Sequence, residues 1–222
     1  MSFNIAIDGP AGAGKSTIAK KVAKELSFVY VDTGSLYRAV ALYLLRENIS
    51  TEDNTAIKEA CQQIHIHIEY QNGEQQVLLN DENVTGMLRT EEVGKIASAS
   101  AANSCVRAAL LDIQRDMAAR ENIVMDGRDI GTHVLPRAGL KIYLTASTAA
   151  RANRRFLELQ AKGIACNLNK IEKDIIQRDK QDMTREIAPL RQAEDAVLID
   201  SSYMSINQVV AQVIALYQDE SI

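Results

Sequence analysis

The sequence predicts an α/β fold in which a parallel sheet is flanked by helices. Short apolar runs, rich in β-branched or aromatic residues, recur between longer segments with helical spacing. These runs are apolar throughout, which is typical of strands that are buried on both faces. Together the two observations favour a parallel sheet covered by helices. The expected strands are residues 3–8, 28–32, 123–126, 140–145 and 196–200.

Length and composition narrow the class of protein. The 222 residues fit a single domain over residues 1–222, with room for a small insert. The net charge of −4 argues against a basic nucleic-acid binder or a membrane-surface protein. The three cysteines are scattered, so neither a disulfide framework nor a zinc site is expected. With no secretory signal and no apolar stretch near the ~20 residues of a membrane span, we expect a cytoplasmic protein.

The first predicted strand runs into a glycine-rich loop, GPAGAGKST, which matches GxxxxGK[ST] and opens a helix. Backbone N–H groups of such a loop bind phosphate oxygens, and the helix dipole assists them. Lys15 is placed to reach the β and γ phosphates, and Ser16 to ligate Mg²⁺. The expected ATP-binding residues are Gly9, Pro10, Ala11, Gly12, Ala13, Gly14, Lys15, Ser16 and Thr17.

Other nucleotide-binding classes fit this loop less well. A dinucleotide-binding GxGxxG read from Gly12 places Thr17 where the third glycine belongs, and no strand directly precedes Gly12. A GTPase would carry NKxD, whereas the nearest string, residues 169–172, is NKIE. A P-loop NTPase-type sheet and a small kinase are therefore the leading expectation.

A hydroxyl, an aromatic ring and a guanidinium follow the second predicted strand. Thr33, Tyr37 and Arg38 fall at a turn and at the start of the next helix. Arginine binds phosphate in a bidentate manner and tyrosine packs against a sugar or base, so the cluster suits a phosphate-bearing aromatic ligand. Ordinary helix-start residues would give the same pattern.

Residues 63–80 break the alternation of strand and helix. Apolar and polar residues alternate in the first half, and Asn72-Gly73 follow as a turn. We expect an antiparallel hairpin inserted into the main fold. His65 and His67 share one face of it; two solvent-facing side chains explain them better than a metal site, because no third ligand is evident.

The strand at residues 123–126 ends in the charged string DGRD. Ligands collect at the carboxyl ends of strands in open α/β sheets. Asp126 is placed to orient Mg²⁺, directly or through a water, whereas Arg128 and Asp129 could face a nucleotide. An Arg–Asp pair that caps the strand end is the alternative interpretation.

Two later segments have helical spacing. Arg178, Asp182 and Arg185 are spaced to lie on one helical face, where a solvated ladder of ion pairs is the alternative to a ligand site. The last helix begins behind Ser205, with Gln208 placed for a capping box.

Four motifs together resemble the bacterial cytidylate kinase family: GPAGAGKST, DTGSLYRA, MDGRDIGT and RDKQDMTREIAPL. The likeness spans nearly the whole chain, including the hairpin insert. Adenylate-type kinases share the first motif but not the combination. The family's second motif usually has serine where this chain has Thr33, which keeps the hydroxyl and adds a methyl group.

The resemblance implies a nucleoside monophosphate kinase fold, with an NMP-binding region at about residues 33–105 and a short helical lid at about residues 148–163. Within the lid, Thr148 is expected to cap the helix and Gly163 to end it. The implied CMP-binding residues are Thr33, Tyr37, Arg38, Ser98, Arg107, Arg128, Asp129, Arg178, Asp182 and Arg185.

The resemblance also implies roles within that set. Arg38 and Arg128 would hold the phosphate of CMP. Ser98, Arg107 and Asp129 would read the cytosine. Arg178, Asp182 and Arg185 would hold the ribose and phosphate.

The expected reaction transfers the γ-phosphoryl group of ATP to CMP or dCMP, with no dedicated general base. The acceptor is already an anion, because the second pKa of a phosphate monoester is near ~6. Arginines of the lid would close over the transferring group. The expected catalytic residues are Lys15, Arg128, Arg151, Arg154 and Arg155.

We expect a monomer that acts on these small molecules, with no nucleic-acid or membrane partner. Two alternatives remain open. One is a kinase of another nucleoside monophosphate or small molecule. The other is a nucleotide-sensing regulator in which the charged segments bind a protein.

Overall fold

The structure, a computed structural model, describes residues 2–220 and divides the chain into two compact units. The first unit consists of the residues up to Tyr30 and those from Glu121 onward, and the second spans Val31–Arg120. None of the helices in residues 2–220 is long and apolar enough to cross a bilayer.

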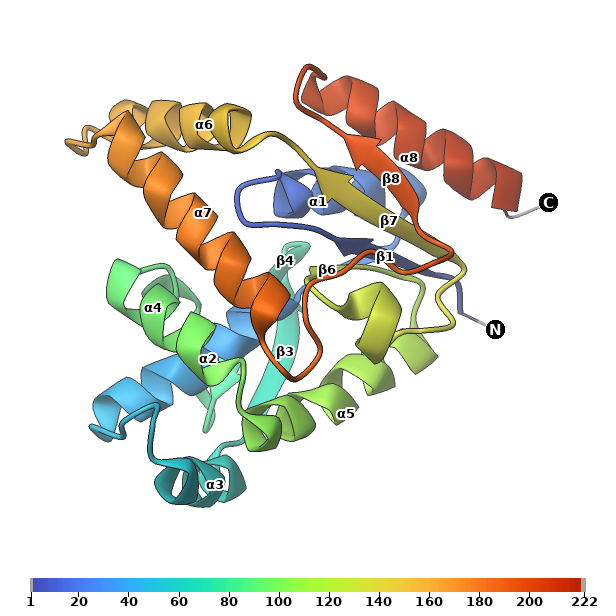
Figure 1. Ribbon diagram of the computed structural model, residues 1–222. Helices are drawn as coiled ribbons and strands as arrows, with labels where there is room; N and C mark the ends of the chain where they lie inside the picture. The colour runs from blue at the N-terminus through green and yellow to red at the C-terminus, as the bar shows by residue number, and fades with distance from the viewer. Residues whose placement is uncertain (1, 221–222) are drawn as a thin grey trace. The chain divides into compact units, whose positions relative to one another are not determined.

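A five-stranded sheet in the order β2-β6-β1-β7-β8 forms the centre of the first unit (Figure 1). Strand β1 pairs in parallel with both β6 and β7, and β7 pairs in parallel with β8. The strands are β1 (Asn4–Asp8), β2 (Val29–Asp32), β6 (Ile123–Gly127), β7 (Leu140–Thr145) and β8 (Val197–Asp200). All five predicted strands are confirmed, each to within one residue at either end; the boundary between the units falls inside β2.

The helices of the first unit are α1 (Lys15–Leu26), α6 (Thr148–Ala161), α7 (Leu168–Thr184) and α8 (Ile206–Glu220). Helices α1 and α8 pack together and against the sheet, and α6 contacts α7 (Figure 1). The core joins apolar strand residues to one face of α1 and one face of α8; among its members are Ile5, Ile7, Ile18, Val22, Leu144, Val209 and Val213. Parallel strands that are apolar on both faces require this cover.

Helix ends agree with the sequence at two places and differ at one. The capping box of α8 is confirmed, because the Ser205 backbone N–H donates to the side-chain oxygen Oε1 of Gln208, and the Gln208 backbone N–H donates to the Ser205 hydroxyl. Gly163, with φ +70°, ends α6 as predicted. The cap of α6 is Ser147 and not Thr148: the Ser147 hydroxyl accepts the Ala150 N–H, and Thr148 is already the first helical residue.

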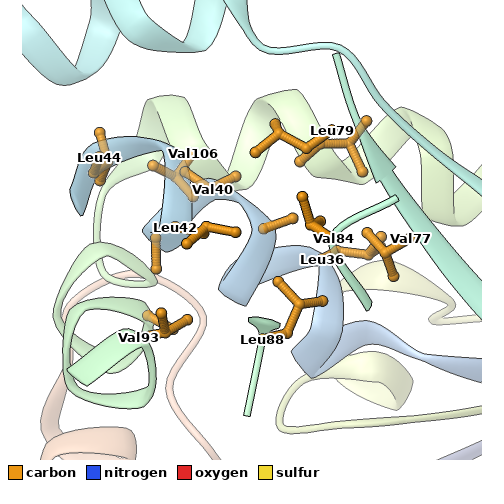
Figure 2. Packing of buried hydrophobic residues seen from close by; sticks show 14 of the residues in the cluster. Leu36, Val40, Leu42, Leu44, Val77, Leu79, Val84, Leu88, Val93 and Val106 are labelled. Atoms are coloured by element: carbon orange, nitrogen blue, oxygen red, sulfur yellow. The ribbon is translucent and has the colours of Figure 1, made fainter. Parts of the chain in front are cut away.

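The second unit contains four helices and a separate antiparallel sheet in the order β3-β4-β5. The helices are α2 (Thr33–Arg46), α3 (Asn54–Gln63), α4 (Glu91–Ser100) and α5 (Ser104–Arg120), with a short 3₁₀ turn at Thr85–Met87. The strands are β3 (Ile66–Gln71), β4 (Glu74–Leu79) and β5 (Glu82–Asn83). Side chains of α2, α4, α5 and the small sheet meet in one apolar core, in which Leu36, Val40, Leu79 and Val93 take part (Figure 2).

The predicted hairpin is confirmed. Asn72 and Gly73 both have positive φ, 54° and 77°, as a tight two-residue connection between right-twisted strands requires. The short β5, which extends this hairpin into a sheet, was not predicted. Its two polar residues have no apolar alternation that the sequence could reveal.

Candidate active site

The glycine-rich loop lies between β1 and α1, and its glycines are required by the backbone. Gly9, Gly12 and Gly14 have φ of +150°, +75° and +93°. A Cβ at Gly9 would lie 1.9 Å from the carbonyl oxygen of Leu144 on β7, so no side chain fits there. Gly14 is the N-cap of α1, and within the described chain no side chain caps that end. The N–H groups at the start of α1 are therefore available to an anion.

Lys15 is buried against this loop. Its side chain is 5% exposed, and its Nζ donates to the carbonyl oxygen of Pro10 at 2.8 Å. Burial lowers the pKa of Lys15 and the charge of Arg128 lowers it further, whereas Asp126 and Asp8 raise it. A polyphosphate beside Lys15 would favour its charged form, because an opposite charge at close range offsets the desolvation.

Ser16 and Asp126 place two oxygen donors next to the loop. The Ser16 hydroxyl donates to Asp126 Oδ2 at 3.0 Å, and the Tyr30 hydroxyl donates to Asp126 Oδ1 at 2.8 Å. The parallel register, in which Asp126 on β6 lies opposite Ile7 on β1, brings the two ends together. A hydroxyl and a carboxylate suit Mg²⁺, which takes one or two protein oxygens and completes its shell with waters and phosphate.

Of the three arginines in the predicted lid, Arg151 is the one that the structure brings to the loop. Its Nη1 lies 2.7 Å from Asp179 Oδ2 and donates to the carbonyl oxygen of Ala11 at 2.9 Å. The Ala11 N–H donates to Asp179 Oδ1 at 3.4 Å. A Cβ at Gly12 would lie 3.4 Å from Arg151 Cβ, so the loop packs closely on α6. An ion pair between α6 and α7 therefore brackets the backbone of the glycine-rich loop.

Arg154 and Arg155 make other contacts. Arg154 bonds to the hydroxyl and carbonyl oxygens of Ser201, in the turn after β8. Arg155 is about half exposed and pairs with Glu158 at 2.8 Å on the same helix. Because residues three and four apart on a helix point in related but distinct directions, the spacing of these arginines did not determine which one faces the loop.

The charged segment after β6 is held by ion pairs to the end of α7. Arg128 Nε lies 2.7 Å from Asp182 Oδ2, and Arg185 Nη2 lies 3.0 Å from Asp129 Oδ1. Arg128 Nη1 also donates to the carbonyl oxygen of Gly127. The structure thus brings together two segments that the sequence assigned to one ligand, and it pairs their charges.

Arg178 and Arg185 differ in their position relative to α7. Arg178 lies on α7, one turn before Asp182. Arg185 is not on the helix, as the spacing predicted, but is its C-cap, with φ −64° and ψ 141°. Its Nε bonds to the carbonyl oxygen of Ala188, so the side chain is fixed by the turn that follows α7.

The other candidate CMP-binding residues lie in the second unit. The Arg107 guanidinium carbon is 5.7 Å from the centre of the Tyr37 ring, a cation–π distance, and Arg107 is 5% exposed. The Arg38 guanidinium folds over the start of α2, where a Cβ at Gly34 would meet its Nη1 at 3.1 Å. Thr33 is buried at the start of α2, and the hydroxyl of Ser98 on α4 is buried with no partner among the described atoms.

Three residues near the phosphate loop were not predicted as site residues from the sequence: Asp8, Tyr30 and Asp179. Asp8 had a usable signal, because it ends a strand directly before Gly9, in parallel with Asp126 at the end of β6. Asp179 lies in the string RDKQD but one residue after Arg178, a helical position that the chosen face left out. Tyr30 belongs to an apolar strand and carried no polar pattern.

A parallel sheet with a GxxxxGK[ST] loop after its first strand, a helix N-terminus left open to anions and an adjoining Ser–Asp pair define a P-loop phosphotransferase. The model of the cytidylate kinase family matches residues 5–219. The chain belongs to the cytidylate kinase family.

Relatives support this over the full length. A cytidylate kinase of Caldicellulosiruptor bescii is 49% identical over 97% of this chain and 95% of its own. One of Listeria welshimeri is 51% identical over 97% of this chain and 96% of its own. Among solved structures, an uncharacterized protein from Eubacterium ventriosum has a TM-score of 0.56 at 11% identity, covering 97% of this chain and 98% of that one. That likeness concerns the fold alone.

Proposed function

We propose that this protein transfers the γ-phosphoryl group of ATP to CMP or dCMP, giving ADP and CDP or dCDP. The observation that supports this most is the assembly in the first unit of Lys15, the Ser16–Asp126 pair and the DGRD segment around one phosphate-binding loop. Family membership supplies the acceptor, since the relatives carry the name cytidylate kinase.

The donor half of the proposal uses the residues of the loop. Backbone N–H groups from Gly12 onward and the Lys15 ammonium bind the phosphates of ATP. Ser16 and Asp126 would hold Mg²⁺, directly or through a water, and a bound Mg²⁺ would supply positive charge beside the phosphates of ATP. Tyr30 orients the Asp126 carboxylate by donating to its other oxygen.

The acceptor half uses charged residues that their neighbours already orient. Asp182 holds Arg128 by its Nε, and Asp129 is held by Arg185. We propose that Arg128 binds the phosphate of CMP and that Asp129 accepts from the cytosine amine. Orientation before binding lowers the entropy lost when the nucleotide is fixed in place.

The remaining assignments follow the family resemblance. Arg38 binds the acceptor phosphate, Ser98 and Arg107 bind the base, and Arg178, Asp182 and Arg185 bind the ribose and phosphate. Thr33 and Tyr37 complete the acceptor residues. The side-chain hydroxyl of Ser98, buried without a described partner, agrees with a role toward a ligand.

The lid arginines are proposed to stabilise the transferring phosphoryl group. Arg151 is already beside Ala11. Arg154 and Arg155 would first leave Ser201 and Glu158, contacts of the kind that a partly exposed arginine exchanges at small cost. We further propose a cytoplasmic monomer whose partners are these nucleotides.

An acceptor screen tests the proposal. The protein is incubated with ATP and Mg²⁺ and with CMP, dCMP, UMP or AMP in turn, and nucleoside diphosphates are separated and quantified. We expect CMP and dCMP to be used best. Preference for UMP or AMP would support a different monophosphate kinase, and nucleotide binding without any diphosphate product would support a sensor.

A further inference from the structure

Asp8 is a buried carboxylate that the proposed mechanism leaves without a role. It ends β1, directly before Gly9, and is 5% exposed. In the sheet register it lies opposite Gly127 of β6 on one side and Tyr143 of β7 on the other. Asp8 is therefore in the middle of the sheet, at the carboxyl ends of the strands, where the phosphate loop begins.

Both oxygens of Asp8 accept backbone N–H groups from one segment. Oδ1 accepts from Ile130 at 2.8 Å, and Oδ2 accepts from Gly131 at 2.7 Å. Burial raises the pKa of Asp8 to about 6, and the two N–H donors oppose that rise. A charge buried at this depth is retained only with strong hydrogen bonds, and bonds to an ionised acceptor are the strong kind.

The segment that Asp8 holds follows directly on Arg128 and Asp129. Residues Ile130–Val134 form one π-helical turn, and Asp129 enters it with φ −146° and ψ 27°. π turns of this kind are rare and are often found at functional sites. Asp8 supplies an anion at the first two N–H groups of the turn, where a helix end favours negative charge.

The side chain of Lys141 packs closely against Gly131, in addition to Asp8. A Cβ there would lie 3.2 Å from Cδ of Lys141 and 3.4 Å from Asp8 Oδ2. Lys141 is itself fixed, because its Nζ donates to the carbonyl oxygen of Pro136 and to Asp195, both at 2.6 Å. The backbone after Asp129 therefore has little freedom to shift.

We propose that Asp8 is a positioning residue for the acceptor nucleotide: by holding the N–H groups of Ile130 and Gly131 it fixes how Arg128 and Asp129 are presented to CMP. The inference rests on the proposed function. Asp8 ends β1, the strand that leads into the proposed ATP-binding loop, and it also binds the segment that follows Arg128 and Asp129. One residue therefore connects the proposed donor site to the proposed acceptor site.

The substitution Asp8→Asn tests this with little change in size. An amide oxygen can accept one of the two N–H groups, but its NH₂ would face the other donor. We expect the KM for CMP to rise by about tenfold or more, as the loss of a bond to an ionised group implies, and the preference for CMP over UMP to fall. The KM for ATP should change far less.

Asp200→Asn is the matched control. Asp200 also ends a strand of this sheet and also accepts two hydrogen bonds, from the N–H and hydroxyl of Ser202, but it is exposed. The variant Asp200→Asn should leave the KM for CMP and the KM for ATP unchanged. Two results for Asp8→Asn would overturn the inference, provided that the wild-type protein phosphorylates CMP. One is an equal increase in the KM for CMP and the KM for ATP, and the other is no change in either KM.

Gly131→Ala provides a second test that leaves the Asp8 charge, and hence its effect on Lys15, in place. The added methyl would lie 3.2 Å from Cδ of Lys141, which both Pro136 and Asp195 hold in place, so the held segment is expected to shift by a few tenths of an ångström. It should reproduce the rise in the KM for CMP, whereas Gly86→Ala, where a Cβ meets no described atom within 4 Å, should not. An unchanged KM in Gly131→Ala would overturn the inference; wild-type protein that does not phosphorylate CMP would instead overturn the proposed function.

Discussion

The guanidinium of Arg151 and the carboxylate of Asp179 form a buried ion pair of 2.7 Å between α6 and α7. Both side chains also bond to the backbone of Ala11, in the phosphate loop. The pair ties α6 and α7 to the loop that is proposed to bind ATP. Removing one member would leave the other as an uncompensated charge among buried atoms.

Asp179→Ala should therefore destabilise the protein by about 3 kcal/mol. Urea denaturation, followed by circular dichroism, measures the change in the free energy of unfolding. Glu158→Ala is the control, since Glu158 forms an exposed pair with Arg155 and should change that free energy by only about 0.5 kcal/mol. Similar small losses in the two variants would show that the buried pair contributes little.

Lys15→Ala should lower kcat by about 10²–10³-fold, because it removes the ammonium that lies on the loop backbone beside the proposed phosphate site. CMP binding, measured by calorimetry without ATP, should be largely retained. Lys162→Ala, which removes an exposed lysine paired with Glu158, should leave both quantities unchanged. Normal turnover in Lys15→Ala would refute the assignment of the phosphate loop.

Asp129→Ala should reduce discrimination between CMP and UMP by about 1–3 kcal/mol, the range for a lost bidentate contact to a base. It also releases Arg185, so the variant Asp129→Asn is measured beside it. The readout is the ratio of kcat/KM for the two acceptors. An exposed aspartate in an i,i+4 pair, Asp116, serves as the control. A constant ratio would remove Asp129 from base recognition.

The raised pKa of Asp8 predicts a specific dependence of stability on pH. Its pKa is about 6 in the folded protein against an ordinary 3.8, so between these values the folded state keeps a proton that the unfolded state has released. Stability relative to Asp8→Asn should therefore fall as the pH rises from 4 to 7, by on the order of 3 kcal/mol. Asp129 raises this pKa and Lys15 lowers it.

Urea denaturation of both proteins at several pH values measures this difference. Asp200→Asn gives the opposite sign, because hydrogen bonds from Ser202 lower the pKa of Asp200 and its contribution is lost as the pH falls. A difference between wild type and Asp8→Asn that is independent of pH would contradict the burial of an ionised Asp8.

The sequence predicted those parts of the fold that local chemistry determines. Uninterrupted apolar runs marked the parallel strands, Asn72-Gly73 marked the hairpin, and the loop motif marked the phosphate site. The cap of α6 was misplaced by one residue because adjacent Ser147 and Thr148 are both good caps.

Features that depend on distant residues could not be predicted. The π turn at Ile130–Val134 is held by Asp8, more than a hundred residues earlier in the chain. Likewise, which arginine of α6 reaches the loop depends on Asp179 and on the turn at Ser201, and not on helical spacing. The sequence therefore located the charged clusters but not the pairing within them.

The rate of CMP phosphorylation by ATP and Mg²⁺, compared with that of UMP under the same conditions, tests the central claim most directly. The arrangement of Lys15, Arg128 and Asp129 predicts a higher kcat/KM for CMP than for UMP, with CDP and ADP formed in equal amounts. Equal or greater use of UMP, or ADP formed without CDP, would contradict it.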